Sequence, residues 1–324
     1  MMSVTKIALP APLRGVVPPM VTPLAGQDRL DIPGLERLIE RMIAGGIHAL
    51  FPLGTTGEST CLSNQLRCEL LERTCHQVAG RVPVLVGVTD TWPEGSVQLA
   101  RFAAGLGATG VVISAPYYLP PDQEDLASYV RYVVAEQPLP VFLYNIPVLT
   151  KTGYEVDTVR RLADIDRVVG LKDSSGDLGY LEQVVKQVQR KDWTVLVGTE
   201  ALLPDAIARG AHGCVGGGAN LDPKLFVSLY EAAVRGDKPT IQSLQQRVMI
   251  LDQIYRQGPG IASIIRGLKC ALGCAGVCSD RMAEPFRSAN HEEQRAIQAI
   301  VEQLFGEPPS PSQLTAVQGV ATIA

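Results

Sequence analysis

The feature that most constrains the fold of this chain is a regular alternation of short apolar runs with amphipathic stretches. The runs are rich in valine, isoleucine and leucine and lack strict apolar–polar alternation, which is typical of parallel strands buried on both faces. They lie at 15–22, 49–54, 82–89, 110–116, 141–147, 168–172, 194–198 and 213–217. The pattern repeats after roughly 30 residues, the size of one strand–helix unit. We therefore expect an α/β fold.

The stretches between the runs have helical spacing, as in the stripe formed by Leu35, Leu38 and Met42. Several of them end on small residues and glycine, as helix C-termini do. Eight strands, each followed by a helix, predict a (β/α)8 barrel, or TIM barrel, as the catalytic domain over 1–235. Helical patterns without intervening strands then predict a C-terminal helical extension over 236–305. Those patterns lie at 239–256, 261–272 and 291–305, and a tail rich in proline and serine at its start occupies 306–324.

Composition excludes two classes of partner. The chain has 29 Lys and Arg against 33 Asp and Glu, a net charge of −4 and only 5% aromatic residues. A nucleic-acid surface needs clustered positive charge and stacking aromatics, and the sequence shows neither. No stretch approaches the roughly 20 apolar residues of a membrane span, and the first residues contain no apolar signal segment. We expect a cytoplasmic protein with no nucleic-acid and no membrane partner.

The cysteines and one glycine motif do not predict a cofactor site. The seven cysteines form two sets at helical spacing, with no C-x-x-C pair and no nearby histidine, so we expect buried reduced thiols rather than a metal site. A G-x-G-x-x-G match at 105–110 closes a helix and precedes a strand. A dinucleotide-binding motif has the reverse order, following a strand and opening a helix. Neither metal nor dinucleotide binding is predicted.

One lysine stands out because it ends a predicted buried strand. Lys172 directly follows the apolar residues 168–171, and the catalytic groups of such barrels come from the C-terminal ends of strands. Removing an ammonium group from water lowers its pKa and leaves free amine, which attacks a carbonyl carbon to form a Schiff base. The alternative is a lysine that reaches toward solvent or pairs with a carboxylate. The position favours catalysis.

Other strand ends carry groups that complement such a lysine. Tyr144 ends the preceding strand, 28 residues earlier, where its phenol can pass protons; otherwise it is an aromatic that lines the barrel. Thr55 and Thr56 lie in a glycine-flanked loop whose hydroxyl and N–H groups can hold a carboxylate, as an alternative to ordinary turn capping. Glu58 in the same loop is expected to be structural and turned back toward backbone amides.

Four motifs together carry a resemblance to a known family. GTTGE at 54–58, PYY at 116–118, YNIP at 144–147 and GLKD at 170–173 occur in this order. In this combination the chain resembles the dihydrodipicolinate synthase/N-acetylneuraminate lyase family of pyruvate-dependent class I lyases. The similarity extends over roughly residues 12–300 and includes the C-terminal helices.

The resemblance implies a role for each of these residues. Lys172 would form the Schiff base with pyruvate or another 2-oxo acid, and Tyr144 would be the general acid and base beside it. Thr55 and Thr56 would bind the pyruvate carboxylate, with Thr55 also passing protons. Tyr118 would reach into a neighbouring subunit's site, because members are usually homotetramers built from two tight dimers. No metal and no organic cofactor is implied.

The loop after the tyrosine strand departs from one branch of the family. Synthases of lysine biosynthesis usually carry an arginine there that grips the second substrate's carboxylate. This chain has VLTKTG at 148–153, two residues longer and without arginine, and the ammonium of Lys151 does not reproduce the arginine fork. The resemblance places Glu200 where sugar-acid lyases hold hydroxyl groups, and Gly217 where a serine is common, which disfavours sialic acid itself.

We therefore predict a Schiff-base lyase or aldolase that interconverts a 2-oxo-3-deoxy sugar acid, or a related 4-hydroxy-2-oxo acid, with pyruvate and an aldehyde. The expected catalytic residues are Lys172, Tyr144, Thr55 and Tyr118, and the expected substrate-binding residues are Thr55, Thr56, Glu200 and Gly217. The alternatives are the 4-hydroxy-tetrahydrodipicolinate synthase reaction, a dehydratase of the same family, and an inactive protein that only binds a 2-oxo acid. A barrel for phosphorylated ligands has only the glycines at 216–218 as a candidate phosphate loop.

Overall fold

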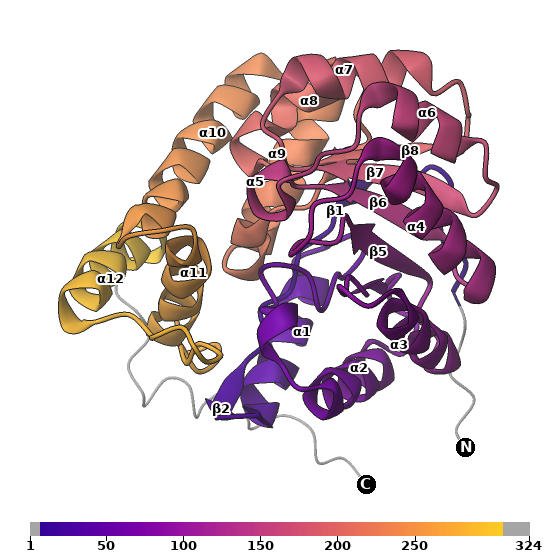
Figure 1. The fold of residues 1–324 in the computed structure, drawn as a ribbon. Helices are drawn as coiled ribbons and strands as arrows, with labels where there is room; N and C mark the ends of the chain where they lie inside the picture. The colour runs from indigo at the N-terminus through magenta and orange to yellow at the C-terminus, as the bar shows by residue number, and fades with distance from the viewer. Residues whose placement is uncertain (1–6, 307–324) are drawn as a thin grey trace, which may run out of the picture.

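The computed structural model describes residues 7–306, which form a parallel sheet wrapped by helices (Figure 1). Seven strands lie in the order β1-β9-β8-β7-β6-β5-β4, and every neighbouring pair is parallel. The strands are β1 (Gly15–Val16), β4 (Leu85–Gly87), β5 (Gly110–Ser114), β6 (Val141–Asn145), β7 (Val168–Asp173), β8 (Thr194–Val197) and β9 (Gly213–Cys214). The predicted α/β class is confirmed.

The two edges of this sheet are both joined to the segment 48–52. On one side the N–H of Phe51 donates to the carbonyl of Pro18 at 3.0 Å, and on the other side the N–H of Leu50 donates to the carbonyl of Pro83 at 2.8 Å. Isolated parallel bridges accompany both contacts. The segment therefore occupies the place between β1 and β4 that the predicted strand 49–54 was to fill.

Several predicted strands are shorter than expected, and prolines explain the two largest differences. The first strand ends at Val16 because Pro18 and Pro19 have no N–H to donate to a sheet ladder. The predicted strand 49–54 is reduced to isolated bridges because Pro52 also lacks a donor and Leu53 adopts a left-handed backbone with φ of 60°. A tight turn replaces extended chain at that point.

A small hairpin was not predicted. β2 (Leu24–Gly26) pairs antiparallel with β3 (Arg29–Leu30) outside the main sheet. Strands of two or three residues are too short to show an alternation in the sequence.

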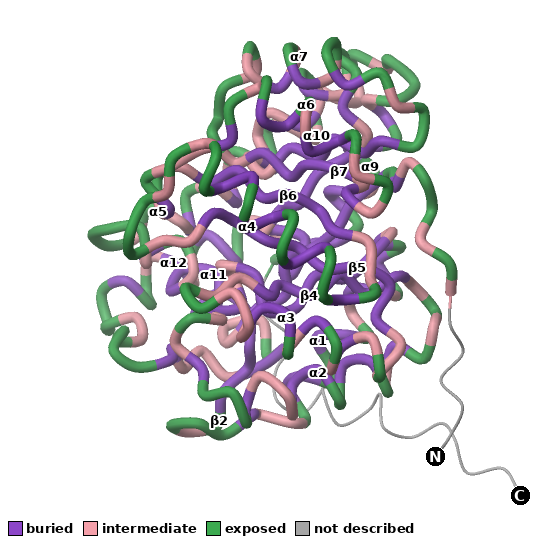
Figure 2. Tube along the Cα trace, turned by 45° about the vertical axis from the view of Figure 1, so that its right-hand side comes forward, coloured by how far each residue is buried: buried purple, intermediate pink, exposed green. Residues whose placement is uncertain are grey.

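Helices surround the sheet, so that the strands are buried and the outward helix faces are exposed (Figure 2). They are α1 (Ile32–Ala44), α2 (Asn64–Val78), α3 (Pro93–Gly105), α4 (Gln123–Glu136), α5 (Pro147–Thr150), α6 (Val156–Ala163), α7 (Leu178–Gln187), α8 (Leu203–Ala208) and α9 (Pro223–Arg235). Several of them are capped at the N-terminus by an aspartate or serine whose side chain accepts an N–H of the first turn, as Asp122 does at α4.

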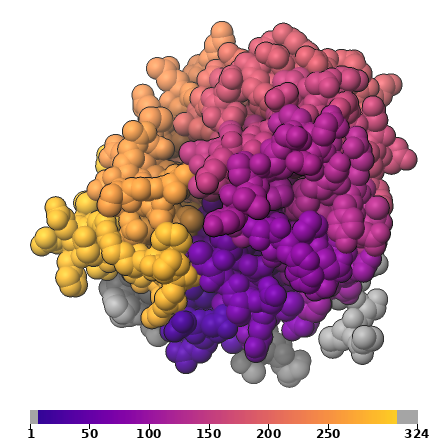
Figure 3. Space-filling model, viewed as in Figure 1, coloured from indigo at the N-terminus to yellow at the C-terminus, as the bar shows by residue number. Residues whose placement is uncertain are grey.

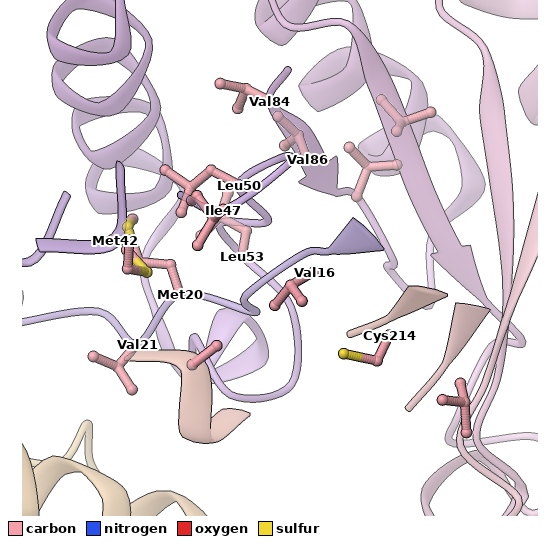
Figure 4. Packing of buried hydrophobic residues seen from close by; sticks show 14 of the residues in the cluster. Val16, Met20, Val21, Met42, Ile47, Leu50, Leu53, Val84, Val86 and Cys214 are labelled. Atoms are coloured by element: carbon pink, nitrogen blue, oxygen red, sulfur yellow. The ribbon is translucent and has the colours of Figure 1, made fainter. Parts of the chain in front are cut away.

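The buried residues form two apolar clusters that correspond to the two faces of the sheet. The larger lies between strands and helices, and Figure 4 shows part of it, with Met42 of α1 beside Met20. The smaller cluster draws a few side chains from the strand segments, among them Phe51, Phe142, Tyr144 and Leu196. Alternate residues of a strand point to opposite faces, so the smaller cluster is the interior of the sheet.

The last helices lie to one side of the sheet (Figure 1). They are α10 (Lys238–Asp252), the 3-10 turn η4 (Gln253–Arg256), α11 (Ala262–Cys274) and α12 (His291–Phe305). Figure 3 shows them against the N-terminal segments, where Arg37 Nε donates to the carbonyl of Val277 at 2.9 Å. Residues 307–324 of the predicted tail lie outside the described residues.

The expectation of buried thiols holds in part. All seven cysteines are free, and four are buried, but Cys61, Cys68 and Cys274 are half-buried. Among residues 7–306 no group of three or more His, Cys, Asp or Glu side chains is placed to hold a metal ion. In the same range no helix is both long enough and apolar enough to cross a membrane.

Candidate active site

The side chains of Lys172 and Tyr144 meet inside the sheet. Their Cα atoms are register partners on β7 and β6, so both side chains point to the same face. Both residues are buried, with 5% and 6% of their surface exposed. The Lys172 Nζ atom lies 3.7 Å from the centre of the Tyr144 ring and 5.1 Å from that of Phe51. The structure thus places an amine and a phenol together at the C-terminal ends of adjacent strands.

This pairing shifts the acidity of both groups. Burial lowers the pKa of Lys172, and the neighbouring Tyr144 opposes part of that change. Burial alone would raise the pKa of Tyr144, but the charge of Lys172 and hydrogen bonds with Thr55, Lys172 and Ser174 outweigh it and bring the pKa below its ordinary value. A lowered amine pKa increases the fraction of free amine, the nucleophilic form, at neutral pH. A phenol made more acidic passes protons more readily.

The loop 54–58 brings hydroxyl and amide groups to the same place. Thr55 Oγ1 lies 3.4 Å from Tyr144 Oη. Within residues 7–306, the backbone N–H groups of Thr55 and Thr56 donate to no protein acceptor. Unused, adjacent N–H groups in a turn form an anion-binding concavity. The loop is therefore suited to hold a carboxylate beside the amine.

Glu58 anchors this loop to the C-terminal helices. Its Oε2 lies 2.5 Å from Lys269 Nζ of α11, and its Oε1 accepts the N–H of Ala283 at 2.8 Å. Glu58 was expected to turn toward backbone amides, and it does so at Ala283, but its second partner is a lysine that is completely buried. No local signal links residues 211 positions apart, so the sequence did not indicate this pair.

A second group of predicted residues lies after β8 and β9. Glu200 begins the 3-10 turn η2 (Glu200–Leu202) and is buried. Its Oε1 accepts the Tyr255 hydroxyl at 2.5 Å, and its Oε2 accepts the N–H of Gly218 at 2.9 Å. A Cβ atom at Gly217 would lie 3.5 Å from Tyr255 Oη. Tyr255 was not predicted as a site residue, because it lies within a helical pattern, 239–256, that carries no chemical motif.

The loop after β6 is held in a defined shape. Thr150 Oγ1 donates to the carbonyl groups of Ile146 and Thr152 at 3.0 and 2.8 Å. Lys151 caps α5 with a left-handed backbone, φ of 63°, and is exposed. The only cation of the loop therefore lies in solvent, at the turn after the helix.

Tyr118 is separate from these groups. Its side chain is 78% exposed, as is that of Leu119 at 77%, and both precede Pro120-Pro121 in the loop between β5 and α4. Among the described residues, Tyr118 makes no side-chain hydrogen bond that would fix it to its own chain. Thus Lys172, Tyr144 and Thr55 form one cluster, Glu200 and Gly217 adjoin Tyr255, and Tyr118 projects from the surface.

Comparison with known proteins finds relatives over nearly the whole chain. The model of the dihydrodipicolinate synthetase family matches residues 12–304. A DapA-like lyase of Halobacterium salinarum is 34% identical over 290 residues, which cover 90% of this chain and 93% of the relative. A 4-hydroxy-tetrahydrodipicolinate synthase of Phenylobacterium zucineum is 32% identical over 292 residues, covering 89% and 96%.

Solved structures agree with these relatives. The dihydrodipicolinate synthase of Bacteroides thetaiotaomicron is 44% identical with a TM-score of 0.88, and the match covers 91% of this chain and 99% of that one. YagE, a prophage protein of the dihydrodipicolinic acid synthase family from E. coli K12, was solved in complex with pyruvate. It is 28% identical with a TM-score of 0.84, covering 90% and 98%.

Proposed function

The chain belongs to the dihydrodipicolinate synthetase family, and from this premise we propose that it cleaves a 2-oxo-3-deoxy sugar acid, or a related 4-hydroxy-2-oxo acid, to pyruvate and an aldehyde. The family consists of pyruvate-dependent Schiff-base lyases and aldolases, and this protein is an enzyme of that class. The observation that carries the proposal is the buried contact between Lys172 and Tyr144, at 3.7 Å from amine to ring centre.

The first half of the reaction is formation of an iminium ion. The lone pair of the Lys172 amine attacks the 2-oxo carbon, and the carbonyl oxygen takes a proton by way of Tyr144. A second proton transfer releases this oxygen as water and leaves a C=N⁺ bond. Thr55 supports the relay, because its hydroxyl lies 3.4 Å from the phenol. Because the amine, the phenol and the hydroxyl are held close together, the proton transfers do not require separate molecules to meet, which would cost translational and rotational entropy.

The second half breaks the carbon–carbon bond. A proton leaves the hydroxyl on C4, the C3–C4 bond breaks, and its electron pair moves into the iminium to give an enamine and the free aldehyde. Protonation of the enamine at C3 and hydrolysis then release pyruvate and restore the lysine. The atoms and electrons of this sequence balance without an oxidant or reductant, so the proposed reaction needs no cofactor. In this scheme Thr55 and Thr56 hold the carboxylate, supported by their unused N–H groups.

The second-substrate region favours hydroxylated over acidic aldehydes. The loop after β6 contains no arginine, and its lysine, Lys151, is exposed rather than turned inward. Glu200 presents a buried carboxyl group after β8. Carboxylate oxygens accept hydrogen bonds from hydroxyl groups and repel a second carboxylate. Glu200, with Gly217 beside it, is therefore our candidate for contacts to the hydroxyl groups of the aldehyde part.

We expect the purified enzyme to release pyruvate from at least one member of a panel of 2-oxo-3-deoxy sugar acids and 4-hydroxy-2-oxo acids. Pyruvate release is followed with a coupled assay, and condensation of pyruvate with aspartate semialdehyde is measured in parallel. Efficient condensation with the semialdehyde, together with no cleavage of any panel member, would contradict the proposed substrate and assign the synthase reaction to this enzyme.

The synthase reaction is the second candidate. It is favoured by the names of the relatives, since a 4-hydroxy-tetrahydrodipicolinate synthase is 32% identical over 89% of this chain. Its iminium chemistry is the same, and only the aldehyde differs. The panel assay distinguishes the two functions, because it measures both cleavage of the sugar acids and condensation of pyruvate with aspartate semialdehyde.

The assembly and the complete barrel are also proposals. The segment 48–52, bonded to β1 and β4, supports a (β/α)8 barrel that ends near residue 235 and carries 236–305 as an appendage. The exposed Tyr118-Leu119 tip supports insertion into a neighbouring subunit, within a homotetramer of two dimers. There the phenol would extend the proton relay of the partner's site.

Tyr118→Phe removes only the hydroxyl, so we expect turnover to fall by about a hundredfold, the lower end of the range for loss of a proton-relay group. The unfolding midpoint should stay unchanged, because the side chain is exposed. Steady-state kinetics and thermal unfolding test both statements. Sedimentation at decreasing concentration adds a further test, since a fully active monomer would contradict the shared site.

A further inference from the structure

A side chain from the C-terminal helices reaches the end of the sheet at one point that the proposed chemistry does not use. Tyr255 lies in η4, directly after α10, and donates its hydroxyl to Glu200 Oε1 at 2.5 Å. Glu200 follows the end of β8 by three residues, and β8 is the neighbour of the strand that carries Lys172. The hydrogen bond therefore joins the appendage to the side of the sheet on which the lysine strand ends.

We propose that Tyr255 is a positioning residue that fixes the Glu200 carboxylate as an acceptor for hydroxyl groups on the aldehyde part of the substrate. The proposal rests on the proposed function for the identity of that substrate. Each carboxylate oxygen of Glu200 takes one protein donor, Tyr255 at Oε1 and the N–H of Gly218 at Oε2. Because an ionised carboxylate offers about four acceptor positions, roughly two remain for a ligand.

The surroundings of Glu200 offer no side chain other than Tyr255 to hold its carboxyl group. A Cβ atom at Gly216 would lie 2.7 Å from Glu200 Oε2, so glycine lets the carboxyl group lie directly against the chain after β9. Among residues 7–306, Glu200 has no lysine or arginine partner within salt-bridge distance. Tyr255 is therefore its only side-chain donor in this part of the chain, and loss of that donor leaves the carboxyl group held at one oxygen, by the N–H of Gly218.

The charges around Glu200 agree with this role. The titratable groups that face it are Tyr255, Asp252 and Cys214, and Asp252 is itself paired with Arg256 at 2.5 Å. Burial raises the pKa of Glu200 to about 7, while the bonds from Tyr255 and Gly218 lower it and Asp252 raises it. The carboxyl group therefore changes charge near neutral pH. Without the phenol donor the ionised form loses support, and the pKa rises further.

The test is Tyr255→Phe, which keeps the ring and removes the hydroxyl. For a 2-oxo-3-deoxy sugar acid we expect KM to rise about tenfold, the effect of losing one hydrogen bond involving a charged group. The acid limb of kcat/KM should move to higher pH. For a 4-hydroxy-2-oxo acid with an unsubstituted alkyl tail, neither change is expected, because that tail offers Glu200 no hydroxyl.

The matched control is Tyr132→Phe. Tyr132 Oη donates to Glu94 Oε2 at 2.9 Å, so the same bond type is removed on the exposed surface between α3 and α4. This variant should leave both substrates and the pH profile unchanged.

Infrared spectroscopy tests the role of Tyr255 without any substrate, so this measurement does not depend on which aldehyde the enzyme releases. The infrared band of a protonated carboxyl group, taken as the difference between wild type and Glu200→Gln, reports the titration of Glu200 alone. Tyr255→Phe should shift this titration to higher pH.

Equal losses for both substrates, or an unshifted titration, would overturn the positioning role. Failure of the proposed function gives a different result: the wild-type enzyme and the Tyr255→Phe variant would then both cleave no panel member. In a Glu200→Gln background, adding Tyr255→Phe should have little further effect on KM, since coupled residues are not additive.

Discussion

Lys172→Ala is expected to lower turnover by roughly four orders of magnitude or more, as loss of a covalent nucleophile does. Incubation of the wild-type enzyme with pyruvate and borohydride should add one pyruvate-derived mass, located on the peptide that contains Lys172, and the variant should add none. The reason is geometric. Within residues 7–306 the buried lysines are Lys172, which faces a phenol, and Lys269, which is paired with Glu58.

A surface lysine provides the control for nonspecific trapping. Lys186 is 69% exposed and pairs with Glu182 one helical turn away. Lys186→Ala should therefore trap pyruvate as the wild type does. An adduct in Lys172→Ala, or no adduct in the wild type, is incompatible with the Schiff-base mechanism.

Lys269→Met is expected to reduce the free energy of unfolding by about 3–5 kcal/mol, the cost of leaving one member of a buried ion pair without its partner. Glu58 would keep only the Ala283 N–H as a donor, in a place where 3% of its surface is exposed. Because Glu58 ends the loop that holds Thr55 and Thr56, KM for the 2-oxo acid should rise as well. Urea unfolding and steady-state kinetics measure the two effects.

Two further variants show whether the buried charge is the cause. Adding Glu58→Gln to Lys269→Met removes the unpaired carboxylate, so the double variant should be more stable than Lys269→Met alone. Lys186→Met breaks an exposed pair and should cost less than about 1 kcal/mol. A loss below about 1 kcal/mol in Lys269→Met would contradict a decisive role for the pair.

The parts of the fold that follow from local pattern were predictable. Strands β5 to β8 appear as apolar runs because each is buried on both faces, and the C-terminal helices appear as amphipathic stripes. The segment 49–54 was predicted to be a full strand, because its residues are apolar. Its turn at Pro52 and Leu53 depends on backbone geometry that hydrophobicity does not report.

The candidate site also contains residues that could be predicted from the sequence and residues that could not. Lys172 and Tyr144 could be found because each ends a strand, and strand ends of a parallel sheet meet at one edge. Their register, residue 144 opposite residue 172, agrees with the strand–helix repeat. Tyr255 and Lys269 could not be found, because they lie in helices whose pattern reports only burial. Their partners, Glu200 and Glu58, are 55 and 211 residues away, and only the tertiary fold brings them together.

The anchor of the loop 54–58 has a consequence for the order of events during synthesis. Glu58 needs Ala283, which is added 225 residues later. At about 5–20 residues per second, roughly ten to fifty seconds separate the two on the ribosome. A nascent chain that already contains every strand of the sheet still lacks the partners that fix its carboxylate-binding loop. Tight binding of pyruvate is therefore expected only for chains whose translation is nearly finished, and shorter nascent chains should bind pyruvate weakly.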